Sequence, residues 1–570
     1  MSTRIGFRAS LVFAASLLFA AVTTLTAKAA ELARPAGVYL HVEIDYMLKQ
    51  AKLDNAPAPQ QHAYVTKTLQ QLLDTWALEG VTVGEQWSAL EPKPPASPDC
   101  SNCDWSYVDE ISDLAKSMGK SVQFIITPGF DSPQWLKDKL QPCDNLFAPS
   151  AVGSPADQST TKNGAGNDAT GKKGKNKQGG NAKPVGDRGS SGKGVGGENT
   201  GPGPDCGSVR FIDFPEQQRA QKDPNGTTYT LPLPWNGDYQ AAWWNFLGAL
   251  SHHLKNRTNV IAVAIAGPIA ASDEMILPTT AYGAKTQVGG VGADDAWSAL
   301  ISNYDKGNGH PQYPSKSDQI FVDLWKTAIQ KYETKFSGLT IFLGPDAGNY
   351  LPTFGLSGPP IQKGDSTLYA VECSAAKQFT FSCQAKTEII SAFIAAKGPN
   401  QKATQVGGMK AASLPDPGDI SVAGVKLLTG PYPPLWHDQQ AIGGAEFDHA
   451  ASNPKDDVGC PLDDPNCKKP QNANMSPETA AANVLKAFFH NTKAGKDYGD
   501  PQAGTETMNY LEVPMDDVVY MEKHGCTAPS GQTSIAKQLF DANNELLVMA
   551  GEKPLVADAC SKPPIRPQTK

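Results

Sequence analysis

Short apolar runs alternate along the chain with longer amphipathic stretches. A typical run is VIAVAIA at 260–266, which is followed directly by Gly267 and Pro268. An unbroken apolar and β-branched run of this kind predicts a strand that is buried on both faces, as in a parallel sheet covered by helices. The amphipathic stretches carry apolar residues at a spacing near 3.6 and predict helices. We therefore expect an α/β protein.

Eight strands are predicted in order along the chain, at 37–43, 81–87, 121–127, 260–266, 339–344, 405–411, 441–447 and 508–513. Predicted helices lie between or after them, at 62–79, 105–118, 239–255, 321–336, 386–396, 421–428, 477–491 and 532–550. Eight parallel strands close a (β/α)8 or TIM barrel. The alternative is an open doubly wound sheet, but that fold usually has fewer strands, and no G-x-G-x-x-G follows the first strand.

The N-terminal 30 residues have the pattern of a secretory signal peptide. Arg4 and Arg8 precede the apolar run 11–22, and Ala27-Lys28-Ala29 supplies small residues for cleavage. We expect residues 31–570 to form a single barrel domain that is secreted or periplasmic. No later stretch is apolar enough over its length to predict a membrane span.

One segment interrupts the strand and helix pattern after the third strand. Residues 146–204 are rich in Gly, Lys and Asn and contain almost no large apolar residues. Such a composition buries too little surface to offset its ordering entropy, so we expect a disordered insertion. Its basic charge is also compatible with binding to an anionic polymer, although a solvated loop is the simpler interpretation.

The chain has ten cysteines, and most of them lie in pairs that are close in sequence. An even number of paired cysteines after a signal peptide favours disulfides in an oxidising compartment. We predict five local disulfides, namely Cys100 with Cys103, Cys143 with Cys206, Cys373 with Cys383, Cys460 with Cys467, and Cys526 with Cys560. A metal or redox role for the C-x-x-C at 100–103 is the weaker alternative, since no second C-x-x-C occurs. The net charge of −8 gives no indication of a nucleic-acid partner.

Acidic and aromatic residues follow most of the predicted strands. Because the carboxyl ends of parallel strands meet at one mouth of a barrel, we expect these side chains to line a common site. Tryptophan rings stack on sugar rings, and carboxylates bind sugar hydroxyls, so an oligo- or polysaccharide is the expected ligand. The predicted substrate-binding residues are Glu43, Glu85, Trp87, Trp135, Asp273, Asp346 and Trp436, the last on the loop before the seventh strand.

Four segments resemble glycoside hydrolases of the clan A barrel type, which include cellulase-like and beta-galactosidase-like enzymes. They are GVTVGEQWSALEP at 80–92, DWSYVDEISDLAKSMGKSVQFIITPG at 104–129, VIAVAIAGPIAASDEM at 260–275 and AIGGAEFD at 441–448. The resemblance implies a retaining mechanism, with Glu274 as acid/base after strand four and Glu446 as nucleophile after strand seven. The clan usually has Asn before the acid/base, and this sequence has Asp273 there.

Two other functions remain open from the sequence. One is a carbohydrate-binding barrel without catalysis, and the other is a secreted scaffold whose basic insertion binds an anionic polymer. No metal or cofactor is expected, because neither H-E-x-x-H nor a similar ligand spacing is present. No G-x-S-x-G motif indicates a serine hydrolase. The oligomeric state is not indicated by the sequence.

Overall fold

The computed structural model describes the chain in several segments. These are residues 35–148 apart from 76, 206–212, 228–343 apart from 271–276, 279, 281–282 and 309–318, and 510–555, with short pieces at 389, 392–393, 409–411, 435–437, 478–479, 481–482 and 485. The predicted signal peptide and residues 149–204 of the predicted insertion lie outside these segments.

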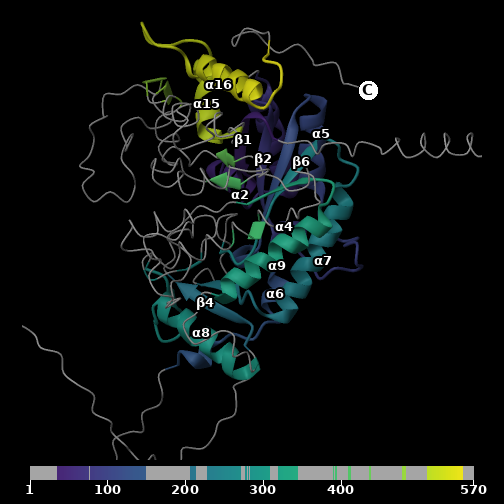
Figure 1. Ribbon diagram of the computed structural model, residues 1–570, viewed down its shortest axis with the longest axis vertical. Coiled ribbons are helices and arrows are strands. Elements are labelled where there is room, and N and C mark those ends of the chain that lie inside the picture. The colour runs from purple at the N-terminus through teal and green to yellow at the C-terminus, as the bar shows by residue number, and fades with distance from the viewer. Residues whose placement is uncertain are drawn as a thin grey trace, which may run out of the picture.

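An eight-stranded parallel sheet forms the centre of the molecule (Figure 1). Its strands are β1 (Gly37–Glu43), β2 (Gly80–Gln86), β3 (Ser121–Thr127), β6 (Val260–Ala264), β8 (Thr340–Phe342), β9 (Met409–Ala411), β10 (Leu435–His437) and β11 (Tyr510–Pro514). Their order in the sheet is β8-β6-β3-β2-β1-β11-β10-β9, and all the pairings are parallel. This is the chain order of a ring that is opened between β8 and β9, which are not paired with each other in the described part of the chain.

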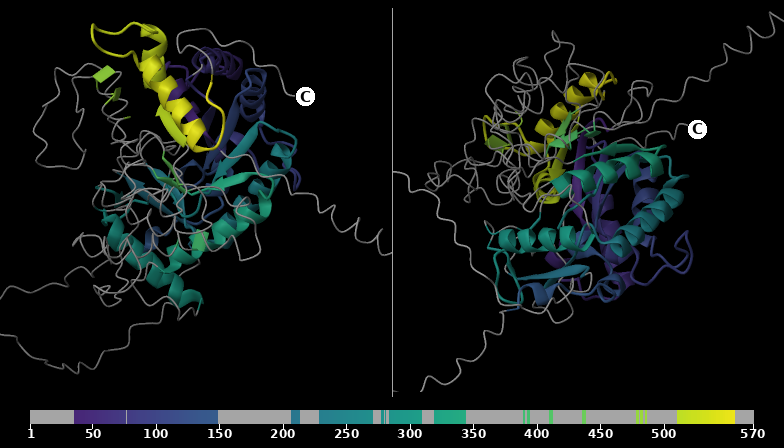
Figure 2. Two further views of the ribbon diagram at one scale, coloured as in Figure 1. Left: turned by 45° about the horizontal axis from the view of Figure 1, so that its top comes forward. Right: turned by 60° about the horizontal axis from the view of Figure 1, so that its bottom comes forward.

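Helices follow the strands and cover the sheet. They are α2 (Ile44–Gln50), α3 (Ala58–Leu73), α4 (Trp87–Leu90), α5 (Ser106–Ser117), α6 (Gln134–Lys137), α7 (Gly237–Leu254), α8 (Ala293–Asn308), α9 (Gln319–Lys335), α15 (Met515–His524) and α16 (Ile535–Met549). In Figure 2, α7 and α9 lie together on one flank of the sheet, whereas α15 and α16 pack against β1. None of the helices in the described segments is long and apolar enough to cross a bilayer.

Alternation along the strands separates two faces of the sheet. On β1, the side chains of Val38, Leu40 and Val42 join the large core that the helices share. The intervening Tyr39 packs on the opposite face, in a small apolar cluster with Ile125, Ile261, Ala262, Ala264, Phe342 and Tyr510. The side chains of one strand thus alternate between the helices and the space that the curving sheet partly encloses.

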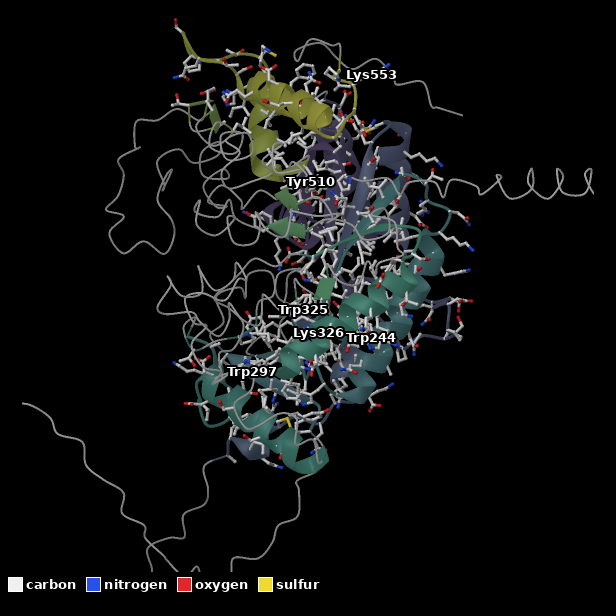
Figure 3. All side chains as sticks on the ribbon, in the orientation of Figure 1. Trp244, Trp297, Trp325, Lys326, Tyr510 and Lys553 are labelled. Carbon is white, nitrogen blue, oxygen red and sulfur yellow. A yellow bond between two sulfur atoms is a disulfide. The ribbon has the colours of Figure 1, made fainter. Side chains whose placement is uncertain are left out.

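A second, smaller sheet packs at the end of the molecule that carries α8. It is antiparallel, in the order β5 (Tyr229–Pro232), β4 (Ser208–Ile212) and β7 (Lys285–Thr286). The sheet has its own core, in which Phe211 and Trp297 are fully buried (Figure 3). The sequence pattern did not predict either this sheet or α8.

The Cys143–Cys206 disulfide joins the two ends of the predicted insertion. The insertion begins later than predicted, because Asp144–Leu146 form a 3-10 turn and Phe147 is buried in the core of the small sheet. Residues 146–148 therefore belong to the folded domain. The Cys100–Cys103 disulfide is also present as predicted.

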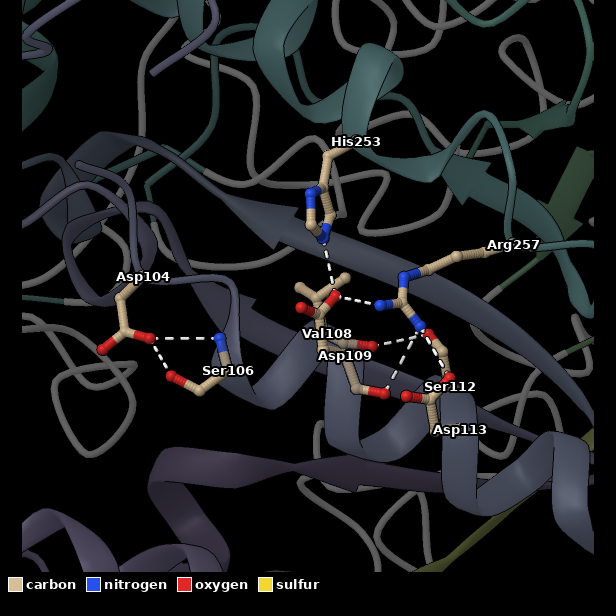
Figure 4. Close-up of polar contacts among 8 residues, drawn as sticks. All are labelled: Asp104, Ser106, Val108, Asp109, Ser112, Asp113, His253 and Arg257. Carbon is tan, nitrogen blue, oxygen red and sulfur yellow. Dashed lines mark hydrogen bonds and ion pairs between the residues drawn. The ribbon is translucent and has the colours of Figure 1, made fainter. Parts of the chain in front are cut away.

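A cluster of ion pairs joins α5 to α7 on the outside of the sheet (Figure 4). The Asp109 carboxylate accepts a hydrogen bond from His253 Nε2 at 2.6 Å and contacts the guanidinium of Arg257, which lies just after α7. Arg257 Nη1 also donates to Asp113 Oδ1 at 3.0 Å. The His253 ring stacks on Trp105, with the ring centroids 4.7 Å apart. These contacts fix the two helices relative to each other.

Candidate functional site

The carboxyl ends of β1, β2 and β3 lie side by side and carry acidic residues. Glu43 ends β1, Glu85 lies near the end of β2, and Asp131 lies in the 3-10 turn that follows β3. Glu85 and Asp131 are buried, whereas the Glu43 side chain is 29% exposed. The parallel arrangement therefore gathers at one edge of the sheet carboxyl groups that are far apart in sequence.

The interior face of the sheet continues this acidic edge as a hydrogen-bonded network. His41 Nε2 lies 3.1 Å from Glu43 Oε1, and His41 Nδ1 lies 3.1 Å from Glu512 Oε2 on β11. Glu512 is fully buried and accepts hydrogen bonds from Thr82 Oγ1, at 2.6 Å, and from the Tyr510 hydroxyl. His41 thus links carboxyl groups on two neighbouring strands.

Gln123 extends the network to β3. Its amide nitrogen donates to Thr82 Oγ1 at 3.1 Å and to the Tyr510 hydroxyl at 2.6 Å. Glu512 was expected at the mouth, at the end of the last predicted strand, but neither it nor Tyr510 was predicted to bind substrate or to act in catalysis. The alternation of Tyr39, His41 and Glu43 was a signal for a polar interior face. What the sequence could not supply was the pairing of β1 with a strand more than 450 residues away.

Gly84 makes room for the Glu43 side chain. A Cβ atom built on Gly84 would overlap the Glu43 carboxyl group, which lies against the β2 backbone. A residue with a side chain at this position would displace Glu43 from its contact with His41. The glycine in VTVGEQW is therefore explained by the space that the Glu43 carboxyl group needs and not by the geometry of the strand.

Glu85 has the most perturbed environment at this edge. Burial raises its pKa to about 8, and the nearby charges of Asp45, Glu43 and Asp131 act in the same direction. Its Oε1 accepts a hydrogen bond from the backbone N–H of Gln86 at 2.9 Å, while its Oε2 is buried and has no hydrogen-bond partner in the described segments. At neutral pH the group is largely protonated and available as a hydrogen-bond donor.

Asp131, in the 3-10 turn after β3, is fixed by a hydrogen bond to the last residue of that strand. It is 1% exposed, and Thr127 Oγ1 donates to its Oδ2 at 2.9 Å. The backbone N–H of Phe130, next to Asp131, donates to Ala270 O at 2.6 Å. This bond fixes the chain just before 271–276 against the turn that carries Asp131.

Two of the three predicted tryptophans, Trp87 and Trp135, occupy different environments. Trp87 is fully buried, packs against Tyr239, Trp243 and Phe246, and donates from its indole nitrogen to Glu91 Oε2 at 2.8 Å. Because its ring is covered by the helix core, this placement does not fit the predicted stacking on a sugar.

Trp135 is only partly buried. Its indole nitrogen donates to the Glu91 carbonyl at 3.0 Å, and Lys139 Nζ lies 4.8 Å from the centre of its ring. Trp135 follows Asp131 by four residues, and its predicted binding role stays a prediction.

The remaining predicted residues fall mostly outside the described segments. Asp273, Glu274, Asp346 and Glu446 are not described. Trp436 lies within β10, so it belongs to a strand and not to the loop before one. The seventh place in the chain order of the sheet is taken by β10, whereas the predicted seventh strand at 441–447 lies outside the described residues. Glu446 therefore comes nine residues after the end of β10 at His437.

The other predicted disulfides are described only in part. Cys526 is disulfide-bonded, but its predicted partner Cys560 and the pairs Cys373–Cys383 and Cys460–Cys467 lie outside the described segments. In those segments, one group of side chains has the geometry to hold a metal ion, namely Glu91 with Cys100 and Cys103, and both of its sulfur atoms are in a disulfide.

Comparisons with known proteins identify no family. No protein-family model matches the chain. No curated protein matches it either. Among solved structures, the catalytic domain of beta-amylase from Paenibacillus polymyxa is similar over 80% of this chain and 94% of that chain, with 9% sequence identity and a TM-score of 0.32. A likeness at this level assigns neither a family nor a function, so the geometry of the site carries the argument.

Proposed function

We propose that the chain is a secreted glycoside hydrolase that cleaves a β-linked oligo- or polysaccharide. The observation that carries the proposal is the group of carboxyls at one edge of the parallel sheet, where Glu43, Glu85 and Asp131 come from three adjacent strands. Glycoside cleavage needs a carboxyl group that stays protonated near neutral pH beside one that is ionised. The environment of Glu85 shows how this edge keeps a proton on a carboxyl group.

The proposal includes a closed (β/α)8 barrel. The strand order runs through all eight strands in chain order with one opening, between β8 and β9. Pairing of these two strands would complete the ring, and an eight-stranded ring has the size that interior side chains can fill. The interior network of His41, Thr82, Gln123 and Glu512 supports this arrangement, because it lies where a barrel keeps its layers of inward-pointing residues.

In this proposal Glu274 is the acid/base and Glu446 the nucleophile of a retaining mechanism. Glu274 follows Ala270, which is bonded to the turn before Asp131, and Glu446 follows β10, a neighbour of β11. In the sequence both glutamates come after the carboxyl end of a strand, as Asp131 does after β3. Glu274 would protonate the leaving oxygen while Glu446 attacks the anomeric carbon, and Glu274 would then activate the water that releases the sugar.

The residues at the acidic edge would bind and orient the sugar. The Glu43 carboxylate, which contacts His41, would accept a hydrogen bond from a sugar hydroxyl. The protonated Glu85 would donate to a hydroxyl or ring oxygen, which would satisfy an oxygen atom that has no partner among the described residues. Trp135 would cover an apolar face of the sugar at the rim.

The test is the turnover of a panel of chromogenic β-glycosides by Glu274→Gln and Glu446→Gln variants. Asp541→Asn is the matched control, because this carboxyl is 56% exposed on α16 and pairs with Lys537. Each of the two glutamate variants should lose at least about 10²-fold in kcat, in line with the loss of a positioned proton donor or nucleophile, while the control keeps full activity. Unchanged turnover in both variants would reject the two-glutamate mechanism. Oligosaccharide binding without any turnover by the wild-type protein would instead identify a carbohydrate-binding barrel.

A further inference from the structure

The loop after α4 brings two cysteines and a buried carboxyl group together. Cys100 and Cys103 form a disulfide within a C-x-x-C sequence. Cys100 Sγ lies 3.6 Å from Glu91 Oε1, and donor atoms of all three residues lie within 4.8 Å of one another. The sequence alone gave no indication of this carboxyl group, because Glu91 precedes the pair by nine residues and comes from the end of another element.

The two sulfur atoms differ in their access to solvent. Cys100 is 2% exposed, whereas Cys103 is half-buried and follows the exposed Ser101. A reagent in solution therefore reaches the sulfur of Cys103 first. The sulfur that would leave in such an attack is the one beside Glu91.

The loop keeps its shape through hydrogen bonds that do not depend on the disulfide. The backbone N–H of Cys103 donates to Cys100 O, and that of Cys100 donates to Ser97 O, both at 2.9 Å. The side chain of Asn102 bonds to the backbone of Ala96 and of Pro94, at 2.7 and 2.8 Å. After reduction the two thiols would therefore stay next to each other, and the bond could form again.

Glu91 is suited to exchange a proton at neutral pH. Burial raises its pKa to about 7, and the indole N–H of Trp87, which donates to Oε2 at 2.8 Å, acts in the opposite direction. This bond also orients the carboxyl group, so that Oε1 is the oxygen that faces Cys100. A thiolate leaving from Cys100 would find a proton donor in contact with it.

We propose that Cys100 and Cys103, together with the carboxyl group of Glu91, form a thiol–disulfide exchange site that accepts two electrons from a dithiol. A thiolate of the dithiol attacks Cys103 Sγ, the S–S bond breaks, and the electron pair leaves on Cys100 Sγ, which takes the proton of Glu91. The second thiolate of the dithiol then attacks its own sulfur in the mixed disulfide and releases Cys103. The protein is reduced to a dithiol, the reductant is oxidised to a disulfide, and Glu91 and Cys103 take up protons from solvent. This inference does not depend on the proposed glycoside hydrolysis.

The Cys143–Cys206 disulfide is a matched internal control. It also has one buried and one half-buried cysteine, but the polar group described beside Cys206 is the Asn303 amide, which cannot supply a proton in the same way. The experiment treats the full-length folded protein with dithiothreitol, traps the thiols by alkylation and measures each cysteine by peptide mass spectrometry. We expect Cys100–Cys103 to be reduced at least about tenfold faster than Cys143–Cys206 at pH 7. Equal rates for the two pairs would overturn the proposal.

A Glu91→Gln variant tests the proton donor itself. It should reduce Cys100–Cys103 about tenfold more slowly at pH 7, a smaller effect than the roughly 10²–10⁴-fold of positioned acid–base catalysis because a thiolate is already a good leaving group. The inflection near pH 7 in the rate profile should also disappear, a change that a purely structural role of Glu91 would not produce. If this variant does not fold, Trp87→Phe keeps the carboxyl group but removes its indole donor, and the inflection should then move to higher pH. A rate profile that is the same as that of the wild type, in whichever variant folds, would exclude Glu91 as the proton donor.

Discussion

Replacing Glu85 with Gln should change how the stability of the protein depends on pH. The substitution keeps the size of the side chain and removes a carboxyl group whose pKa is raised by burial from its ordinary value of 4.5 to about 8. Below pH 4.5 the group is protonated in both the folded and the unfolded protein. Between pH 4.5 and 8 the unfolded chain releases this proton while the folded protein keeps it, so rising pH favours unfolding.

The size of the effect follows from the interval between the two pKa values. One pH unit between them lowers the free energy of unfolding by about 1.4 kcal/mol. The interval from 4.5 to about 8 therefore amounts to about 5 kcal/mol. Glu85 is 5% exposed, so solvent screening reduces this figure little. Gln does not titrate. As the pH rises from 4.5 to about 8, the free energy of unfolding of the Glu85→Gln variant should therefore increase by about 5 kcal/mol relative to that of the wild type.

Urea unfolding at pH values from 4 to 9 measures this difference directly. The midpoints of the wild type and of Glu85→Gln should diverge steadily as the pH rises to 8 and remain separated above it. Asp541→Asn controls for the removal of one carboxyl group from a site that is mostly exposed. Parallel curves for the wild type and Glu85→Gln across the whole range would show that Glu85 has an ordinary pKa, and the electrostatic account of the acidic edge would then be wrong.

Two further substitutions test the interior network and the contact between helices. Tyr510→Phe removes the hydroxyl that donates to Glu512 and accepts from Gln123. It should lower the free energy of unfolding by about 1–3 kcal/mol, measured in urea, because two buried hydrogen bonds are lost; a neutral result would show that the network does not contribute to stability. Asp109→Asn removes the charge that Arg257 and His253 share, and the expected loss is about 1 kcal/mol and smaller at high salt; a loss that does not depend on salt would rule out an ion-pair origin.

The strands of the large sheet were predicted well where apolar residues dominate. Strands were predicted at 37–43, 121–127 and 260–266, and the structure has β1 (Gly37–Glu43), β3 (Ser121–Thr127) and β6 (Val260–Ala264) there, of which β6 is two residues shorter than predicted. Such runs carry their own signal, because both faces of a central strand need apolar or small residues. By contrast, β10 has only three residues, in the segment PPLWHDQQ, and no pattern of alternation fits into so short a strand.

The small antiparallel sheet was missed for a different reason. Its strands are short, β7 has only two residues, and they pair across segments that are far apart in the chain, as in Phe211 with Thr286. What stabilises them is their common core around Trp297, which forms only when these segments meet. Local sequence patterns contain no information about which distant segments pack together, so these strands could not be predicted from them.

Some side chains of the candidate site could be predicted from the sequence, and others depend on how distant strands pair. Glu43 and Glu85 could be placed from the sequence, since their position depends only on where a strand ends. The partnership of Glu512 with His41 and Thr82 could not, because it depends on the register between β11 and β1.

The composition of the acidic edge is not explained by folding alone. A parallel sheet of this kind is most stable when apolar side chains fill its interior, and a buried carboxyl group without a full set of partners costs free energy. Glu85 remains buried, with one oxygen atom that no described residue partners, next to other acidic groups that disfavour its charge. The Glu512 carboxyl group, on the interior face of the sheet, needs Thr82 and His41 from two other strands to satisfy its oxygens. Carboxyl groups that destabilise the fold, gathered at the edge where parallel strands end, are better accounted for by binding and proton transfer than by structure, because an apolar residue would stabilise each position more.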